Sequence, residues 1–235
     1  RRPLPHYDTR HDSGNHRHQN PKAEILDQFL HSLTIPFHIK DEQSYNIRSI
    51  YFDDYNNNCF YDNESGINER YKVRIRIYDK LDTLIKLEIK YKKNGFTKKE
   101  VCNIDKNICN KLIKGEFLRL EECNNKVLNK LYLEQHLHNL VPKLIVEYDR
   151  TAYINKIGNV RVTFDTNIRT SKHIDRFFED NIYSYPILEI GKHILEVKYD
   201  ELVPDYIMEA IELNNLRQTA FSKYYLSRIR MEAFI

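Results

Sequence analysis

The chain has 235 residues, of which 41% are hydrophobic and 30% charged, and its formal net charge is +3. This length allows one large domain or two small ones, and the apolar content allows a buried core. The near balance of charge argues against a nucleic-acid coat protein, and no apolar run approaches the length of a membrane helix.

Residues 1–21 differ from the rest because they are rich in Arg and His and hold one aliphatic residue, Leu4, apart from prolines. So little apolar surface cannot offset the entropy lost on ordering, so we expect an arm that is disordered or not native to the domain. The structured domain is predicted from 22 to 235. It opens with a helix whose apolar face runs from Ile25 to Leu33, and Pro36 follows as a stop signal.

Strands and helices follow in mixed order. Apolar alternation predicts strands at 47–52, 70–78, 83–92, 143–149, 159–165 and 193–199. The run 53–58 is interpreted as a loop and Asn94-Gly95 as a hairpin turn. Asp105 is expected to cap a helix that ends before Gly115. Further helices are predicted at 127–140, from Pro204 to about Leu213, and from about Phe221 onwards.

The cysteines show neither CxxC spacing nor a His partner at zinc spacing; they are Cys59, Cys102, Cys109 and Cys123. We interpret them as reduced thiols. The sequence shows no signal peptide with an apolar central region. We therefore expect a cytoplasmic protein that reaches a membrane only through a partner.

Four predicted strands carry charge on one face and apolar residues on the other, because residues two apart share a face. The charged sets are Lys72, Arg74 and Arg76; Lys86, Glu88 and Lys90; Arg161, Thr163 and Asp165; and Glu196 and Lys198. One interpretation is the solvated face of an antiparallel sheet. The other is a barrel that turns these faces inward as a polar tunnel, with helices at 22–34, 125–140 and 204–213 covering its apolar outside.

A tunnel of this composition suits a linear string of phosphates. Distributed Arg and Lys side chains match the several charges of triphosphate or polyphosphate. The carboxylates would hold Mg²⁺ or Mn²⁺, which then bridges phosphate oxygens. An in-line phosphoryl transfer needs mainly positioning and charge neutralisation, which such a tunnel supplies.

Seven segments in one colinear order, between roughly residues 22 and 228, resemble the VTC domain. This is the polyphosphate-polymerase domain of the triphosphate tunnel metalloenzyme superfamily, also described as CYTH-like. The segments are YNIRSIYFDD (45–54), ERYKVRIRIY (69–78), LEIKYKKNGFTKKE (87–100), VPKLIVEYDRTAY (141–153), NVRVTFDTN (159–167), ILEVKYDELVPD (194–205) and RQTAFSKY (217–224).

The resemblance implies an α+β fold: an eight-stranded antiparallel β-barrel, the triphosphate tunnel fold, with helices packed outside. It also implies transfer of the γ-phosphate of ATP to a growing polyphosphate chain, with Mn²⁺ or Mg²⁺ as the divalent metal. Carried over, the phosphate-gripping residues are Arg74, Arg76, Lys90, Arg150 and Arg161. The metal ligand is Glu196. Further substrate-binding residues are Lys98 or Lys99, Lys198, Ser222 and Lys223.

The superfamily begins with a strand of pattern ExExK, whereas residues 10–20 here read RHDSGNHRHQN. The chain is then a degenerate member or carries a replaced start, and the first strand of the barrel is in doubt. A non-catalytic polyphosphate-binding module and a metal-dependent triphosphatase are the alternatives to a polymerase. The expected ligands are ATP, triphosphate or polyphosphate and not nucleic acid. A membrane-protein partner is compatible with the resemblance, and the oligomeric state stays open.

Overall fold

The computed structural model describes residues 6–9, 37–39, 44–189, 191–200, 202–211 and 216–233, and the helix predicted at 22–34 lies outside them. The chain divides into two compact units, each built from separate stretches of sequence. Unit 1 comprises Arg1–Tyr45, Asp149–Ile168 and Leu188–Phe221, and unit 2 comprises Asn46–Tyr148, Arg169–Ile187 and Ser222–Ile235. Two long strands, β7 (Val141–Asn155) and β8 (Val160–Ser171), contribute residues to both units.

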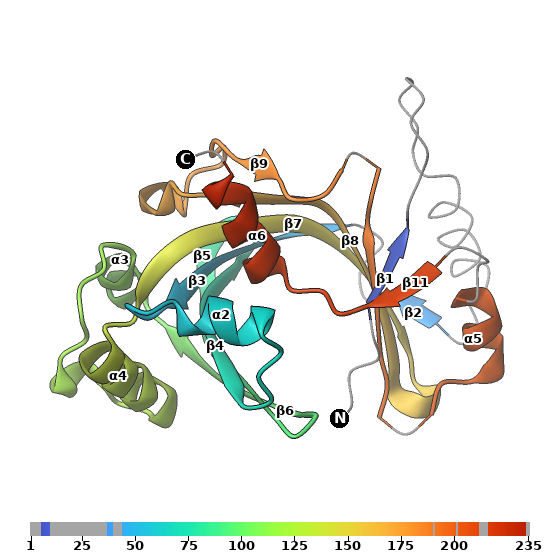
Figure 1. Cartoon of the computed structure of the whole chain (residues 1–235), viewed down its shortest axis with the longest axis horizontal. Coiled ribbons are helices and arrows are strands. Elements are labelled where there is room, and N and C mark those ends of the chain that lie inside the picture. The colour runs from blue at the N-terminus through green and yellow to red at the C-terminus, as the bar shows by residue number, and fades with distance from the viewer. Residues whose placement is uncertain are drawn as a thin grey trace. The chain divides into compact units, whose positions relative to one another are not determined.

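The sheet of unit 2 has the strand order β7-β3-β4-β5-β6, with antiparallel pairs throughout β3–β6 (Figure 1). Its strands besides β7 are β3 (Tyr45–Asp53), β4 (Arg70–Tyr78), β5 (Leu81–Lys93) and β6 (Phe96–Ile104). The short strand β9 (Tyr185–Pro186) pairs with β8. Asn94 and Gly95 both have positive φ, 50° and 78°, as the predicted hairpin turn between β5 and β6 requires.

Helices cover the apolar face of this sheet. Val73, Ile75 and Leu87 are fully buried and belong to one core cluster with residues of α3 (Lys106–Ile113) and α4 (Lys126–His138). The predicted N-cap of α3 is confirmed, since Asp105 accepts a hydrogen bond from the Ile108 amide at 2.8 Å. The strand alternation therefore has its expected cause: every second residue packs beneath a helix.

The loop predicted at 53–58 is confirmed for 54–57, and a helix begins at its last residue. After β3 the chain turns into α2 (Asn58–Glu64), whose first amides are bound by the carboxylate of Asp53. The same carboxylate accepts a hydrogen bond from the Tyr224 hydroxyl at 2.6 Å, and Tyr224 belongs to α6 (Lys223–Glu232). The α2 and α6 helices lie side by side in Figure 1, and the rings of Phe60 and Tyr225 stack between them.

A buried arginine ties the loop after β8 to the sheet of unit 2. Arg48 on β3 is fully buried and pairs with Glu147 at 3.0 Å. Its guanidinium also donates to the carbonyls of Phe177 at 2.8 Å and Glu179 at 2.5 Å. Because the Arg48 guanidinium has an ion-pair partner and carbonyl acceptors, its positive charge can be buried away from water.

Unit 1 contains the strand order β11-β1-β10-β8-β7, and β2 pairs with β7. Its shorter elements are β1 (His6–Thr9), β2 (Phe37–Ile39), β10 (Ile194–Lys198), β11 (Leu216–Thr219) and the helix α5 (Asp205–Ile211). Gly158 precedes β8 with φ +69°, and a Cβ there would lie 2.4 Å from the Leu202 carbonyl oxygen. A glycine is therefore needed at that turn.

The antiparallel sheet with a few helices confirms the predicted fold class, whereas closure of the sheet into a barrel stays a prediction. Four residues of the predicted arm form the extended strand β1, which pairs with β10 and β11, and the assignment of residues 1–21 as an arm stays a prediction. Backbone hydrogen bonds to two neighbours supply an ordering force that composition alone does not register. In the part of the chain described, no helix has the length and hydrophobicity needed to cross a membrane.

Replacing Arg48 tests the buried ion pair. We expect Arg48→Met to lower the free energy of unfolding by about 3–5 kcal/mol, because Glu147 would keep an unpaired charge away from water. Chemical denaturation measures the loss. The double variant Arg48→Met/Glu147→Leu should recover part of it. If the single and double variants were equally unstable, the charge of Glu147 would not be the cause.

Candidate functional site

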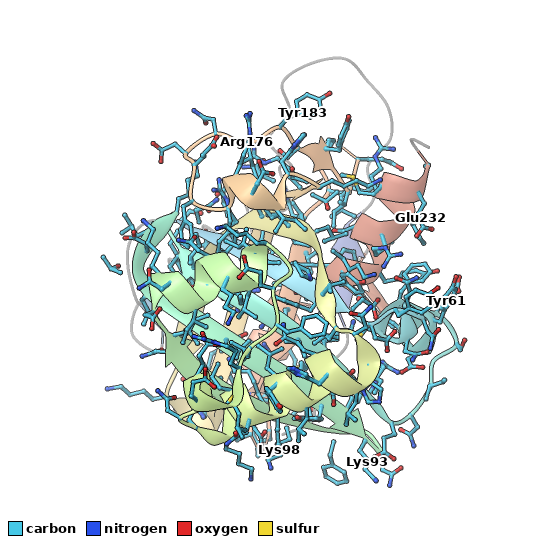
Figure 2. All side chains as sticks on the ribbon, turned by 90° about the vertical axis from the view of Figure 1, so that its left-hand side faces the viewer. Tyr61, Lys93, Lys98, Arg176, Tyr183 and Glu232 are labelled. Carbon is cyan, nitrogen blue, oxygen red and sulfur yellow. The ribbon has the colours of Figure 1, made fainter. Side chains whose placement is uncertain are left out.

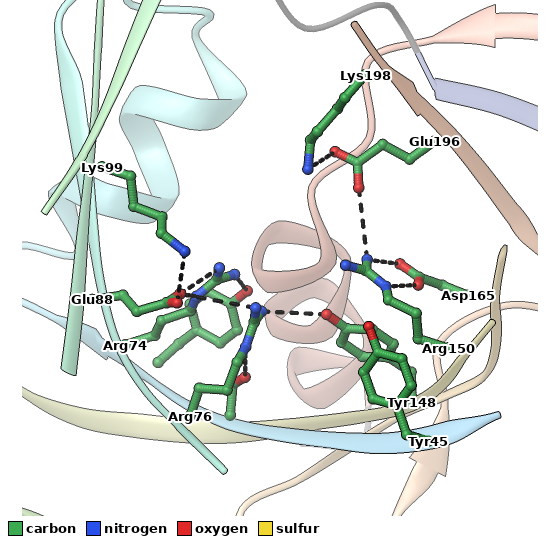
Figure 3. Close-up of polar contacts among 12 residues, drawn as sticks. Tyr45, Arg74, Arg76, Glu88, Lys99, Tyr148, Arg150, Asp165, Glu196 and Lys198 are labelled. Atoms are coloured by element: carbon green, nitrogen blue, oxygen red, sulfur yellow. Dashed lines mark hydrogen bonds and ion pairs between the residues drawn. The ribbon is translucent and has the colours of Figure 1, made fainter. Parts of the chain in front are cut away.

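The charged face of unit 2 centres on one carboxylate. Glu88 on β5 lies opposite Arg74 on β4 and forms an ion pair with it at 2.6 Å. Lys99 on β6 reaches the other oxygen of Glu88 at 2.8 Å, and Arg76 lies 3.9 Å from Glu88 (Figure 3). We call these four residues together with Tyr51 the Glu88 cluster.

Burial decides between the two interpretations of this face. The side chains of Glu88 and Arg76 are 1% and 8% exposed, and that of Arg74 is 20% exposed. A solvated outer face would leave such long charged side chains mostly in water. The central part of the charged face is therefore interior to unit 2.

Tyrosine hydroxyls complete the surroundings of the two arginines. Arg74 donates to the Tyr51 hydroxyl at 3.0 Å, and Arg76 donates to Ser49 at 3.2 Å and to the Tyr148 hydroxyl at 3.3 Å. A tyrosine in a strand is usually a packing residue. Tyr51 does stack on Tyr224, with ring centroids 5.3 Å apart, but its hydroxyl also contacts the charged face.

The charges of the cluster alter the acidity of its members. Burial alone would raise the pKa of Glu88, but Arg74, Arg76 and Lys99 outweigh it and lower the pKa to about 2. Burial would likewise raise the pKa of Tyr51, but the two arginines and Lys223 lower it to about 8. Both shifts report a positive local field that favours negative charge.

The hairpin register separates the two lysines between which the sequence left the choice open. Lys99 pairs with Lys90 across the β5–β6 ladder, on the face of Glu88. Lys98 pairs with Tyr91, on the opposite face, where it forms an ion pair with Glu100 at 2.9 Å. In Figure 2, Lys98 lies at the rim of the sheet, and its side chain is 68% exposed.

The start of α6 meets the same charged face. Ser222 is the N-cap of α6, and its hydroxyl accepts a hydrogen bond from the Tyr225 amide at 3.2 Å. Its hydroxyl also accepts a hydrogen bond from Lys72 on β4 at 2.7 Å. The ammonium of Lys223 lies 4.8 Å from the ring centroid of Tyr148. Ser222 and Lys223, both predicted substrate-binding residues, thus contact Lys72 and Tyr148, and the Tyr148 hydroxyl in turn accepts a hydrogen bond from Arg76 of the Glu88 cluster.

Unit 1 holds a second charged group, built on β7, β8 and β10. Arg150 binds Asp165 through two hydrogen bonds, at 2.5 and 2.7 Å. Glu196 lies 3.6 Å from Arg150 and forms an ion pair with Lys198 at 2.9 Å (Figure 3). Burial lowers the pKa of Lys198 and is opposed by Glu196. We call these four residues with Arg161 the Arg150 cluster.

Arg161 differs from the other arginines of its unit. It lies opposite Lys198 in the β8–β10 ladder, and its guanidinium donates to the Tyr45 hydroxyl at 3.3 Å. Its Nε is buried and has no hydrogen-bond partner among the described residues. A buried cationic donor without an acceptor is costly, so this atom is suited to an anionic ligand.

The described residues do not by themselves form a metal site. Among them, no three or more His, Cys, Asp and Glu side chains lie close enough together to hold a metal ion. Glu196, the predicted metal ligand, contacts two cations, and Asp165 is held by Arg150. A hard divalent ion requires several oxygen ligands, so the metal role of Glu196 stays a prediction.

Sequence reasoning missed several members of the two groups. Glu88 and Asp165 were recognised as lying on charged strand faces but were not selected as site residues. The available signal was their even spacing from basic residues on the same strand face: Glu88 lies two residues from Lys86 and Lys90, and Asp165 lies four from Arg161. Tyr51, Tyr148 and Ser49 gave no such signal, because a tyrosine or serine in a strand is usually explained by packing.

A family model of the VTC domain matches residues 10–231 of the chain. Two solved structures resemble it as well. One is a candidate adenylyl cyclase from Hippeastrum, described as having a dominant triphosphatase activity, with 13% identity, a TM-score of 0.56, and coverage of 98% of this chain and 96% of that one. The other is a candidate adenylate cyclase from Bacillus halodurans, with 10% identity, a TM-score of 0.50, and coverage of 93% of both chains.

At 13% and 10% identity, the two structures support only the assignment of the fold. No curated protein matches the chain. The family model, by contrast, spans nearly the whole sequence and includes every residue of the Glu88 and Arg150 clusters. The two charged strand groups, the antiparallel sheet and this match lead to one conclusion: the chain belongs to the VTC domain family.

Proposed function

We propose that this domain binds ATP and polyphosphate and transfers the γ-phosphate of ATP to the end of a growing polyphosphate chain. In this reaction a terminal phosphate oxygen of the chain attacks the γ-phosphorus, and ADP leaves with the bridging oxygen. The reaction places negative charge on oxygens along a line. Fixed cations that neutralise this charge are the main requirement on the protein.

The observation that carries the proposal is the excess of cations on the charged face of unit 2, whose centre is buried. From the pair Lys72–Lys90 to the pair Arg76–Lys86, Glu88 is the only carboxylate that β4, β5 and β6 place on that face. One carboxylate cannot neutralise this many basic groups. A bound anion with several charges would complete the balance, and arginine forks suit phosphate oxygens.

The Arg150 cluster supports phosphate binding independently. Arg150 and Lys198 are balanced by Asp165 and Glu196, whereas the buried Nε of Arg161 has no acceptor among the described residues. We assign Arg161 to phosphate binding and Arg150 to a supporting place beside it. Divalent metal dependence is typical of this fold, and Glu196 remains our proposed ligand, to be completed by groups other than those described.

Triphosphate hydrolysis is the second candidate function. The observation in its favour is the fold match to the Hippeastrum protein, which is described as having a dominant triphosphatase activity. Water would replace the chain end as acceptor on the same cations. A binding module without turnover is the third candidate. We further propose that the domain acts in the cytoplasm, with any membrane contact made through a partner protein.

A product assay separates these functions. The protein is incubated with ATP and Mn²⁺, products are resolved on a polyphosphate gel, and free phosphate is measured in parallel. We expect phosphate chains that lengthen with time. Free phosphate without chains would replace the proposal with hydrolysis. Binding of polyphosphate without either product would leave a binding module.

Arginine geometry is tested by a charge-conserving change. We expect Arg74→Lys/Arg76→Lys to weaken binding of inorganic tripolyphosphate by about tenfold or more, because lysine keeps the charge but not the fork that binds two oxygens. Titration calorimetry at near-physiological salt gives the affinity. Arg119→Lys, at an arginine whose side chain is 67% exposed, is the matched control and should leave the affinity unchanged. Equal affinities for all three proteins would remove the Glu88 cluster from the site.

Neutralising Glu88 should have opposite effects on stability and on anion binding. In Glu88→Gln the arginines lose their partner, so the free energy of unfolding falls in the absence of ligand. Inorganic tripolyphosphate should bind a few-fold more tightly, because a carboxylate that repels it is gone. Thermal unfolding with and without tripolyphosphate measures both effects. Weaker binding by the variant would contradict the role of Glu88 as the resident counter-ion.

The pH dependence gives the sign of the Glu88 contribution. Folding lowers the pKa of Glu88 from 4.5 to about 2. The ionised Glu88 carboxylate therefore stabilises the folded state fully above pH 4.5, and this stabilisation is lost as the pH falls through about 2. The stability difference between wild type and Glu88→Gln should therefore shrink over that interval. Glu121→Gln, at an exposed carboxylate, is the control and should show no comparable change.

A further inference from the structure

Lys72 occupies an unusual place on the charged face of unit 2. It is half-buried on β4, two residues before Arg74, and pairs with Lys90 across the ladder. Its ammonium donates to Asn63 of α2 at 2.9 Å and to Ser222, the N-cap of α6, at 2.7 Å. Both acceptors are neutral oxygens. Arg74, Arg76 and Lys99, by contrast, all contact the carboxylate of Glu88.

No carboxylate among the described residues forms an ion pair with Lys72. The titratable groups that act on it are Tyr51 of β3, Arg70 of β4, Lys90 of β5 and Cys59 of α2. Two of these are cations that repel its charge, and the pKa of the Cys59 thiol is itself raised by burial. Tyr51 in its phenolate form favours the protonated lysine, which is otherwise supported by dipoles and by whatever anion binds nearby.

This rests on the proposed function of the same face: we propose that Lys72 is a phosphate-binding residue and that it takes up a proton when a polyphosphate anion binds. The ammonium already lies between α2 and the start of α6, where it can donate its third hydrogen to a phosphate oxygen. Ser222 and Lys223 flank that position from α6. Lys72 therefore extends the line of cations from Arg76 and Arg74 towards the helix.

The proton uptake follows from the electrostatics of the ligand-free protein. Burial, followed by Lys90 and Arg70, lowers the pKa of Lys72 to about 8, so a large fraction of it is neutral at slightly alkaline pH. An anion favours the charged form and raises the pKa again. Tyr51, with a pKa of about 8, would respond with the same sign, because an anion disfavours the phenolate. The two contributions must be separated by substitution.

The test compares Tyr51→Phe with Tyr51→Phe/Lys72→Arg at a pH of about 8. Titration calorimetry of inorganic tripolyphosphate in buffers of different ionisation enthalpy gives the protons exchanged on binding. Arginine keeps the charge but does not titrate. Tyr51→Phe removes an interaction that raises the pKa of Lys72, so at least half of Lys72 is neutral at this pH, and we expect the single variant to take up about half a proton or more beyond the double variant. The protonation of the ligand itself cancels in this difference.

A second measurement covers the case in which arginine does not fit. Lys72→Met should weaken tripolyphosphate binding by about tenfold near pH 7, and the gap from wild type should narrow towards pH 9 as Lys72 loses its charge. Lys93→Arg, at an exposed lysine of the β5 end, is the control and should match wild type at every pH. Thermal unfolding checks that each variant is folded.

The outcomes distinguish this inference from the function on which it rests. Equal proton uptake with and without Lys72, or an affinity gap for Lys72→Met that does not change with pH, would overturn the role of Lys72 and leave the proposed function standing. Failure of the wild-type protein to bind tripolyphosphate at all would overturn both.

Discussion

A single buried carboxylate permits the crowded positive charge of the larger unit. Glu88 holds two arginines and a lysine that would otherwise repel one another across three strands. Its side chain is 1% exposed, so the strands must hold the cations in place around it. Because the balance is incomplete, the same arrangement that stabilises the fold leaves a field that attracts anions. The stability of the sheet and the proposed anion binding thus both depend on the partial neutralisation of these cations by Glu88.

Two-residue periodicity made most of the sheet of unit 2 predictable. Val73, Ile75 and Leu87 alternate with charged residues because helices cover one side of the sheet, where these three side chains are fully buried. The Asn94-Gly95 turn and the Asp105 cap were equally readable, since each depends on residues close in sequence. Elements whose formation depends on residues close in sequence were therefore predicted correctly.

The rest depended on partners distant in sequence. The helix α2 starts at an Asn-rich run that is typical of a loop, and its stability comes from Asp53 and from Tyr224, 171 residues further along the chain. The choice between Lys98 and Lys99 required the register of a hairpin, which one residue of slip would reverse. The partition into two units, each assembled from separate stretches, left no mark in composition.

The bond between Asp53 and Tyr224 also bears on the order in which the molecule is made. Three donors of the Asp53 carboxylate lie within seven residues of it, so α2 can begin to form as soon as its own segment leaves the ribosome. The fourth arrives only with α6, after every strand of both units has been synthesised. Before α6 is made, the Asp53 carboxylate lacks the Tyr224 hydroxyl and the Tyr51 ring lacks the Tyr224 ring on which it stacks. The hydrogen bonds of the Asp53 carboxylate are thus completed only after α6 has been synthesised.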